Sequence, residues 1–248
     1  MLAHPEWALG PAQSAAFEAL VARRAAREPI AYLVGEREFY GRALRVDRRA
    51  LIPRPETELL VALAIRAVAR WRAAGVAPVV LDVGTGSGAI AVTLAAETGA
   101  SVVAIDVSWA ALTLAAENAA LHGQGGRVRL VRGDLLAGVR APVHVVVANL
   151  PYLPTGRRLP RDVAAYEPPI ALYAGPTGTE VSERLLRQAV SVLAPGGALV
   201  LELDEREQAA RLQRLADTLW PSAATEVQRD AGGRERVLSL RTDGPRCF

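Results

Sequence analysis

A four-residue stretch, Asn149-Leu150-Pro151-Tyr152, has side chains suited to holding a nitrogen atom in place. The side-chain oxygen of Asn149 can accept one N–H, and a backbone carbonyl near Leu150 or Pro151 can accept a second. The ring of Tyr152 can pack on a planar group and exclude water. An amide or exocyclic amine nitrogen is a poor nucleophile because its lone pair is delocalised. Holding both hydrogens turns the lone pair toward an electrophile, so orientation and fixed dipoles supply most of the rate without a strong general base.

This stretch directly follows a run of strand-forming residues, Val143 to Ala148. If that run is a buried strand, the four residues lie at its C-terminal end, where open α/β sheets bind their ligands. The alternative is an ordinary Asn/Pro turn after a strand. His144, inside the same run, is interpreted as a structural or surface residue.

A glycine-rich loop, Gly84-Thr85-Gly86-Ser87-Gly88, follows an earlier predicted strand and precedes a predicted helix. Glycine permits positive φ and lets the backbone approach a ligand closely. The match to a dinucleotide-binding loop is incomplete, because Ala89 stands in the place of its last glycine. A G-x-G-x-G loop with an acidic residue just before it is the form found in S-adenosylmethionine methyltransferases. A nicotinamide site is the main alternative. It would require that third glycine and a residue to direct hydride transfer, and neither is found.

Two carboxylates support the S-adenosylmethionine interpretation. Asp106 ends the next predicted strand, about 20 residues on, where a carboxylate can accept both ribose hydroxyls. Asp134 ends the third predicted strand and is placed to meet the adenine amino group. With a methyl donor at the glycine loop, Asn149 is interpreted as part of an amino-methylating site and not as a simple turn.

The rest of the chain supplies the elements that position these residues. From Val79 onward, predicted strands and helices alternate with short links, which is typical of a doubly wound, mostly parallel α/β sheet. The pattern predicts a seven-stranded sheet with an antiparallel hairpin at its end. The predicted strands are 79–83, 101–105, 128–131, 143–148, 198–203, 225–229 and 236–240, and the helices among them are 89–96, 108–119, 180–193 and 207–219. Residues 195–197 are predicted to form a turn, and 153–178 a long functional loop.

Three segments are expected along the chain. Residues 1–27 form a reduced N-terminal helical segment, 28–54 a hairpin-like linker, and 55–248 the α/β domain. Two prolines, Pro53 and Pro55, force an extended entry into a helix that begins at Glu56 or Thr57.

Composition excludes several other classes of function. The net charge is only +3, and the four tryptophans are dispersed, which argues against a nucleic-acid target. One cysteine, Cys247, and three scattered histidines, His4, His122 and His144, predict no metal site. The start lacks the pattern of a signal peptide, and no apolar run is long enough to span a membrane. We therefore expect a cytoplasmic protein, acting as a monomer.

The chain resembles the protein-(glutamine-N5) methyltransferases that modify peptide chain release factors, from about Arg23 to Arg241. The segment Leu51-Ile52-Pro53-Arg54-Pro55-Glu56-Thr57-Glu58 is the most specific match, and the glycine loop is shared by many S-adenosylmethionine enzymes. Further matches are residues 28–33, 38–41, 167–168, 195–197 and 234–237. The family usually has Asn-Pro-Pro-Tyr, and this chain departs from it by carrying Leu150 in place of the first proline. The N-terminal helical domain of the family is also normally longer.

The resemblance implies methylation of the glutamine in a Gly-Gly-Gln loop of a release factor, with S-adenosylhomocysteine as product. It implies that residues 84–88 and Asp106 hold the cofactor, that Leu135 lines the adenine pocket, and that Asn149 contacts both cofactor and glutamine. Pro151 and Tyr152 would complete the glutamine pocket with Leu150, whose backbone carbonyl is kept. Asn-Leu-Pro-Tyr also occurs in adenine-N6 methyltransferases of ribosomal RNA. An amino-methyltransferase acting on adenine or guanine of RNA or DNA is therefore the alternative.

Overall fold

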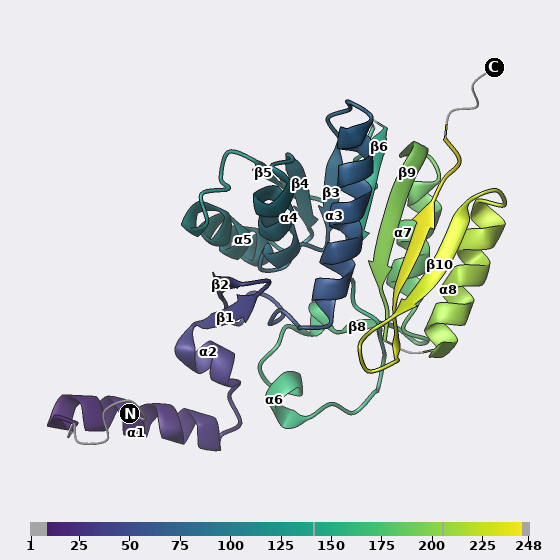
Figure 1. Ribbon diagram of the computed structural model, residues 1–248. Coiled ribbons are helices and arrows are strands. Elements are labelled where there is room, and N and C mark those ends of the chain that lie inside the picture. Colours follow the sequence, from purple (N-terminus) through teal and green to yellow (C-terminus); the bar gives the residue numbers. More distant parts are fainter. Residues whose placement is uncertain (1–8, 141, 205, 245–248) are drawn as a thin grey trace.

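The computed structural model describes residues 9–140, 142–204 and 206–244. Its centre is a seven-stranded sheet in the order β10-β11-β9-β6-β3-β4-β5 (Figure 1). The strands are β3 (Val80–Val83), β4 (Val102–Asp106), β5 (Val128–Arg132), β6 (Val143–Ala148), β9 (Leu193–Glu202), β10 (Ala224–Arg229) and β11 (Glu235–Arg241). Strands β3, β4, β5, β6 and β9 run parallel to one another, while β11 is antiparallel to both β9 and β10.

Helices cover both faces of this sheet (Figure 1). One side carries α3 (Thr57–Ala73), α4 (Ala89–Thr98) and α5 (Trp109–Leu121), and the other carries α7 (Glu180–Ala189) and α8 (Arg206–Leu219). Burial on both faces explains why the central strands are near-continuous apolar runs. In β6, all residues except His144 are buried. Two separate apolar clusters result, one on each face of the sheet.

The sheet changes direction between β3 and β6. From β3 the chain builds outward through β4 to β5, and then returns to place β6 on the other side of β3. Val83 pairs with Ala148, so the residues that follow these strands, Gly84 and Asn149, emerge side by side. Ligands of doubly wound sheets bind at such a point. The two stretches that carry the predicted chemistry are therefore brought together by strand order alone.

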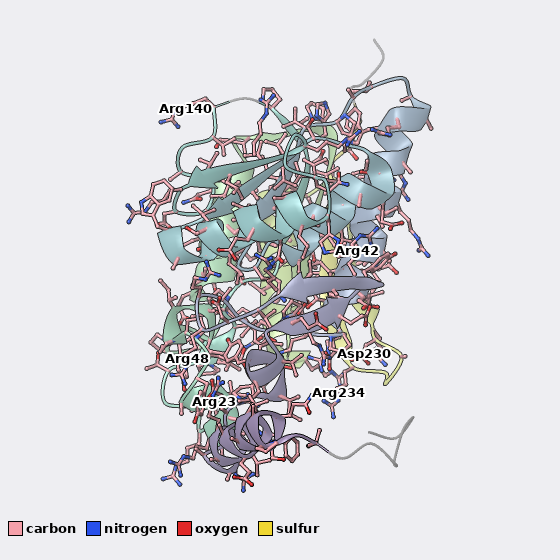
Figure 2. The ribbon with its side chains drawn as sticks, turned by 90° about the vertical axis from the view of Figure 1, so that its left-hand side faces the viewer. Arg23, Arg42, Arg48, Arg140, Asp230 and Arg234 are labelled. Atoms are coloured by element: carbon pink, nitrogen blue, oxygen red, sulfur yellow. The ribbon has the colours of Figure 1, made fainter. Side chains whose placement is uncertain are left out.

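The N-terminal part consists of α1 (Pro11–Ala25), α2 (Ile30–Val34) and a hairpin of β1 (Glu36–Phe39) and β2 (Arg42–Arg45). Helix α1 lies apart from the sheet and buries none of its residues (Figure 1). The buried amide of Asn118 in α5 ties the hairpin to the rest, because it accepts from the backbone N–H of Arg45 at 2.8 Å and donates to its carbonyl at 3.0 Å. Glu28 pairs with Arg23 at 2.8 Å and with Arg48 at 3.6 Å. Figure 2 labels these two arginines in the N-terminal part of the molecule.

Most predicted elements are confirmed, and three details differ. The 28–54 segment contains the predicted hairpin, but the short helix α2 precedes it. The 153–178 loop carries four short elements, β7 (Leu153–Pro154), α6 (Arg161–Ala164), the 3-10 helix η1 (Pro169–Ala171) and β8 (Tyr173–Gly175). The predicted turn at 195–197 is wrong as a strand boundary, because β9 already begins at Leu193. Its pairing with β6 is irregular across those residues, and the regular register starts at Ala198.

His4 and Cys247 lie outside the described residues. Among the residues that are described, no helix is both long and apolar enough to cross a membrane. That same part of the chain contains no group of three or more His, Cys, Asp or Glu side chains able to hold a metal ion.

Candidate active site

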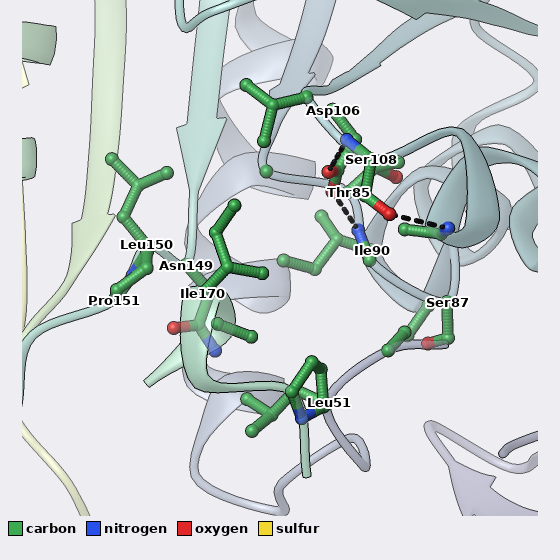
Figure 3. A pocket seen from close by; sticks show the side chains of 18 of the residues that line it. Leu51, Thr85, Ser87, Ile90, Asp106, Ser108, Asn149, Leu150, Pro151 and Ile170 are labelled. Carbon is green, nitrogen blue, oxygen red and sulfur yellow. Dashed lines mark hydrogen bonds between the residues drawn. The ribbon is translucent and has the colours of Figure 1, made fainter. Parts of the chain in front are cut away.

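A cavity of about 430 Å³ opens at the switch point of the sheet. This volume lies in the range of small-molecule sites, roughly 300–1,000 Å³. Figure 3 shows Asp106 and Ser108 on one side of the cavity and Asn149, Leu150 and Pro151 on the other. Further parts of the wall come from the glycine loop, from residues 133–135 and from the segments 49–57 and 168–173.

The glycine loop is held against β4 by its backbone. The N–H groups of Gly84 and Thr85 both donate to the carbonyl of Ile105, at 2.8 and 3.0 Å. Asp106 fixes the next turn, because one oxygen accepts from the N–H of Gly86 at 2.9 Å and the other from the N–H of Ser108 at 2.9 Å (Figure 3). A carboxylate has about four lone-pair sites, so Asp106 keeps acceptor capacity for two hydroxyls.

The five predicted loop residues divide into two roles. Residues 84–87 line the cavity, as predicted for cofactor contacts. Gly88 does not line it. Its φ is +81°, and a Cβ there would lie 3.0 Å from Cα and Cβ of Ala115, so glycine is required for the loop to pack on α5. The carbonyl of Ser87 accepts from the amide of Asn118 at 2.8 Å, and this anchors the loop to the same helix.

Asp82, just before the loop, is fully buried. Burial raises its pKa to about 7, opposed by hydrogen bonds from the Thr85 hydroxyl and the Ala91 N–H. The Thr85 hydroxyl donates at 2.6 Å and the Ala91 N–H at 3.1 Å. Asp82 therefore supports the loop from beneath and does not face the cavity.

This buried carboxyl gives a testable pH dependence of stability. The unfolded chain has an ordinary aspartate pKa of about 3.9, so between roughly pH 4 and 7 the folded state holds a proton that the unfolded state has lost. Stability from this group is therefore lost as pH rises through that window. We measure the melting temperature of Asp82→Asn minus that of wild type, without cofactor. This difference should be at least about 2 °C higher at pH 8 than at pH 5. The exposed Asp217→Asn in α8 is the control, and an equal Asp82→Asn difference at both pH values would contradict the assignment.

Asp134 and Leu135 lie where the adenine contacts were predicted. Both line the cavity. Asp134 forms an ion pair with Arg184 of α7, and its side chain is about half exposed. Leu135 is buried and has a φ of +52°, which is rare for a non-glycine residue. The adenine contact of Asp134 stays a prediction.

The amide of Asn149 has a defined partner. Its nitrogen Nδ2 donates to the hydroxyl of Thr57 at 3.0 Å, at the first residue of α3. Asparagine has one carbonyl oxygen and two N–H donors, so this bond leaves the oxygen available as an acceptor. The acceptor role of Asn149 stays a prediction.

Leu150 packs between the glycine loop and its own stretch, residues 149–152. It is 4% exposed, and its Cδ2 lies 2.9 Å from where a Cβ on Gly84 would stand. The side chain therefore packs into a gap that only a glycine at position 84 leaves open. Pro151 continues along the cavity wall.

A second cavity, of about 210 Å³, adjoins the first. Tyr152 lines the second cavity and not the first, and its backbone carbonyl accepts from the Gln208 side chain at 2.7 Å. Asn149 and Leu150 line both cavities, together with Leu51, Arg54 and Ala171. The four-residue stretch thus stands between two spaces, one facing the glycine loop and one facing Tyr152.

Arg54 and Glu167 pair with each other. Their side chains meet at 2.5 Å, and the other oxygen of Glu167 accepts from the N–H of Ile52 at 3.1 Å. Glu167 is 3% exposed. Both oxygens of Glu167 therefore fix the 51–57 wall to the 153–178 loop.

Sequence patterns assign no functional role to two residues at the site. Thr57 is predicted only as a helix start, and Asn118 only as part of a helix. Their partners are distant in sequence, 92 residues away for the bond of Thr57 to Asn149. A polar residue among apolar helix positions, as at Asn118, was the available signal.

Comparisons with known proteins identify the family. Residues 80–161 match a model described as a methyltransferase domain, and residues 1–35 match a model described as the PrmC N-terminal domain. A release factor glutamine methyltransferase of Deinococcus radiodurans is 45% identical over 238 residues, which cover 95% of this chain and 82% of that protein. The chain belongs to the release factor glutamine methyltransferase family. It is an S-adenosylmethionine-dependent methyltransferase with the mostly parallel, Rossmann-like sheet of class I.

Solved structures agree with this fold. A methyltransferase from Pyrococcus furiosus is similar with a TM-score of 0.61, at 20% identity over 91% of this chain and 98% of that one. The E. cuniculi Mtq2-Trm112 complex, described as responsible for methylation of the eRF1 translation termination factor, matches with a TM-score of 0.50 at 25% identity. That match covers 79% of this chain and 99% of the other.

Proposed function

We propose that the enzyme transfers a methyl group from S-adenosylmethionine to the side-chain amide N5 of the glutamine in the Gly-Gly-Gln motif of peptide chain release factors. The observation that carries this proposal is the orientation of Asn149 between the two cavities. Its nitrogen is bound to Thr57 at 3.0 Å, so its oxygen serves as acceptor for an N–H of the target. The identity of the substrate is inferred from the family to which the chain belongs.

The first cavity is proposed to hold the cofactor. Residues 84–87 and Asp106 are proposed to bind the cofactor, with Asp134 and Leu135 at its adenine. These residues fit the cofactor. The carboxylate of Asp106 would accept hydrogen bonds from the ribose hydroxyls, and the glycines would let the loop backbone approach the cofactor closely. When bound there, the cofactor supplies an electrophilic methyl group. Gly88 supports the loop from outside.

Asn149 and the backbone at Leu150 and Pro151 are proposed to hold the two hydrogens of the target amide. Tyr152 packs against the target from the second cavity. Burial is the main cause that raises the pKa of the Tyr152 phenol, and the nearby carboxylates of Glu202 and Asp204 raise it further. The phenol therefore stays neutral and acts by packing, not as a base. Catalysis by these residues is orientation and fixed electrostatics.

One assay tests the reaction. The enzyme is incubated with radiolabelled S-adenosylmethionine and, in parallel, with unmodified release factor and with ribosomal RNA. We expect label in the release factor and none when its Gly-Gly-Gln glutamine is replaced. Label confined to RNA would support adenine or guanine methylation and sink the proposal. Label retained by the glutamine variant would sink the assignment of the target residue.

The N-terminal segment is proposed to dock the release factor. In α1, Phe17 is 50% exposed and Val21 is 49% exposed, one helical turn apart. Burying such side chains contributes about 1.5–3 kcal/mol each. Phe17→Ser with Val21→Ser should therefore raise KM for the release factor roughly 10-fold or more, with kcat and cofactor affinity unchanged. Glu18→Ala on the same helix is the control, and an unchanged KM would place docking elsewhere.

We further propose the division into segments 1–27, 28–54 and 55–248, and a monomer that acts without a metal in the cytoplasm. A translation factor as substrate supports that location. Sedimentation at working concentrations tests the monomer, and activity retained in a chelator tests the absence of a metal.

A further inference from the structure

Glu202 is a buried carboxylate beside the reacting stretch. It ends β9, where Leu201 pairs with Ala148, so Glu202 lies next to Asn149 in register. It is 3% exposed, and its Oε2 has no hydrogen-bond partner among the described residues. An ionised carboxylate accepts hydrogen bonds and donates none. An unpaired buried acceptor is costly, so its position beside Asn149 calls for an explanation.

Thr57 connects this carboxylate to Asn149. The Thr57 side chain is 3% exposed and accepts from Nδ2 of Asn149 at 3.0 Å. Hydrogen bonding by Thr57 and by Asn149 favours the ionised form of Glu202. A threonine hydroxyl has one proton. If that proton goes to the carboxylate, the hydroxyl oxygen can only accept, and the group of Asn149 that faces it must be the NH₂.

The opposite orientation of Asn149 is disfavoured by the same network. Turning the amide over would place its carbonyl oxygen against the lone pairs of Thr57 and close to the carboxylate of Glu202. Like partial charges in a water-poor site interact strongly because the local dielectric is low. We propose that Glu202 and Thr57 are positioning residues that lock the Asn149 amide with its oxygen toward the acceptor nitrogen.

This inference rests on the proposed function of Asn149. It adds which group donates and which accepts in each hydrogen bond that orients the amide. The charge of Glu202 sets the polarity of the chain of hydrogen bonds from Glu202 through Thr57 to Asn149. A protonated Glu202 can donate to Thr57, which frees the Thr57 proton for the carbonyl of Asn149 and allows the amide to turn over. Turnover should therefore need Glu202 in its ionised form.

The surrounding charges make this titration observable near neutral pH. Burial raises the pKa of Glu202 to about 7, hydrogen bonding by Thr57 lowers it, and Arg236 of β11 lowers it as well. Glu56, before α3, raises it, and hydrogen bonding by Asn149 lowers it. Arg236 also forms ion pairs with Asp204 at 2.5 Å and with Asp230 at 2.9 Å. Glu202 in turn raises the pKa of the Tyr152 phenol, which stays neutral. The sign follows directly: kcat should fall as pH drops below about 7.

The activity test uses isosteric variants. Thr57→Val keeps the shape and removes the hydroxyl, and it should lower kcat roughly 10- to 100-fold, with KM for the release factor and the dissociation constant of S-adenosylhomocysteine within about 2-fold of wild type. Thr57→Ser should restore most of the activity. Glu202→Gln should lower kcat and remove its fall below pH 7. Thr93→Val is the control, because Thr93 is equally buried and its hydroxyl has no partner within the described chain.

A second measurement does not depend on the acceptor. In ¹⁵N NMR spectra, the side-chain amide of Asn149 is assigned as the signal lost in Asn149→Ala, and its shift should titrate near pH 7 in wild type but not in Glu202→Gln. A wild-type enzyme that fails to label release factor while this titration persists would overturn the proposed function alone. Wild-type kcat in Thr57→Val, or an Asn149 signal that does not titrate, would overturn the positioning network.

Discussion

Asn149→Ala should lose turnover by roughly 100- to 1,000-fold, the loss typical of removing one preorganised polar contact to a reacting group. The reason is that Asn149 lines both cavities and its nitrogen is bound to Thr57, which leaves its oxygen as the proposed acceptor for the target. The cofactor has other anchors in the glycine loop and Asp106. Its dissociation constant, measured by calorimetry with S-adenosylhomocysteine, should therefore change by about 3-fold or less, which is under 1 kcal/mol.

A second buried asparagine provides the contrast. Asn118 holds the carbonyl of Ser87 at 2.8 Å and the backbone of Arg45, and it does not line the cavity. Asn118→Ala should weaken cofactor binding and lower the melting temperature more than it lowers kcat at saturating cofactor. Equal losses of turnover and cofactor affinity in Asn149→Ala would mean that Asn149 serves the cofactor only.

The sequence was sufficient to locate the strands that carry the chemistry. Buried parallel strands are apolar along their whole length, and each ends at a distinct polar or glycine residue, such as Gly84, Asp106 or Asn149. Since the carboxyl ends of parallel strands share one edge of the sheet, these residues were expected to meet there, and they line one cavity. The strand ends are thus encoded locally.

Contacts between distant segments were not accessible in the same way. The bond from Asn149 to Thr57 and the pair of Arg54 with Glu167 join residues 92 and 113 positions apart. Nothing in local periodicity selects such partners. The short helix and paired strands inside 153–178 were missed for a related reason, because each is only two to four residues long and is stabilised by its surroundings.

Leu150 shows how a departure from the family motif is accommodated. The usual proline would offer a stiff backbone, whereas leucine offers a larger apolar side chain that packs over Gly84. The backbone carbonyl is kept, and Pro151 still restricts the residue before it. Leu150 therefore couples the glycine loop to the acceptor stretch by packing. The shape of the cofactor loop and the position of Asn149 depend on each other through this side chain.

Asp106→Ala should weaken cofactor binding by roughly 100-fold or more, because hydrogen bonds to a charged group contribute about 1.5–3 kcal/mol each and Asp106 is proposed to accept from two ribose hydroxyls. The same carboxylate also holds the N–H groups of Gly86 and Ser108, both at 2.9 Å. Its removal therefore leaves the loop less ordered as well as the ribose unbound. At saturating cofactor, kcat should recover to within about 10-fold of wild type, because the acceptor stretch is untouched.

Asp134 is the matched control for this experiment, since it lines the same cavity but is half exposed and paired with Arg184. Asp134→Asn keeps an acceptor oxygen for an amino group and should weaken binding only about 3-fold, the scale of an exposed charged pair. Calorimetry with S-adenosylhomocysteine on both variants measures the difference. If the two substitutions weaken binding equally, Asp106 has no special contact with the ribose, and the end of β4 would be only a structural anchor for the loop.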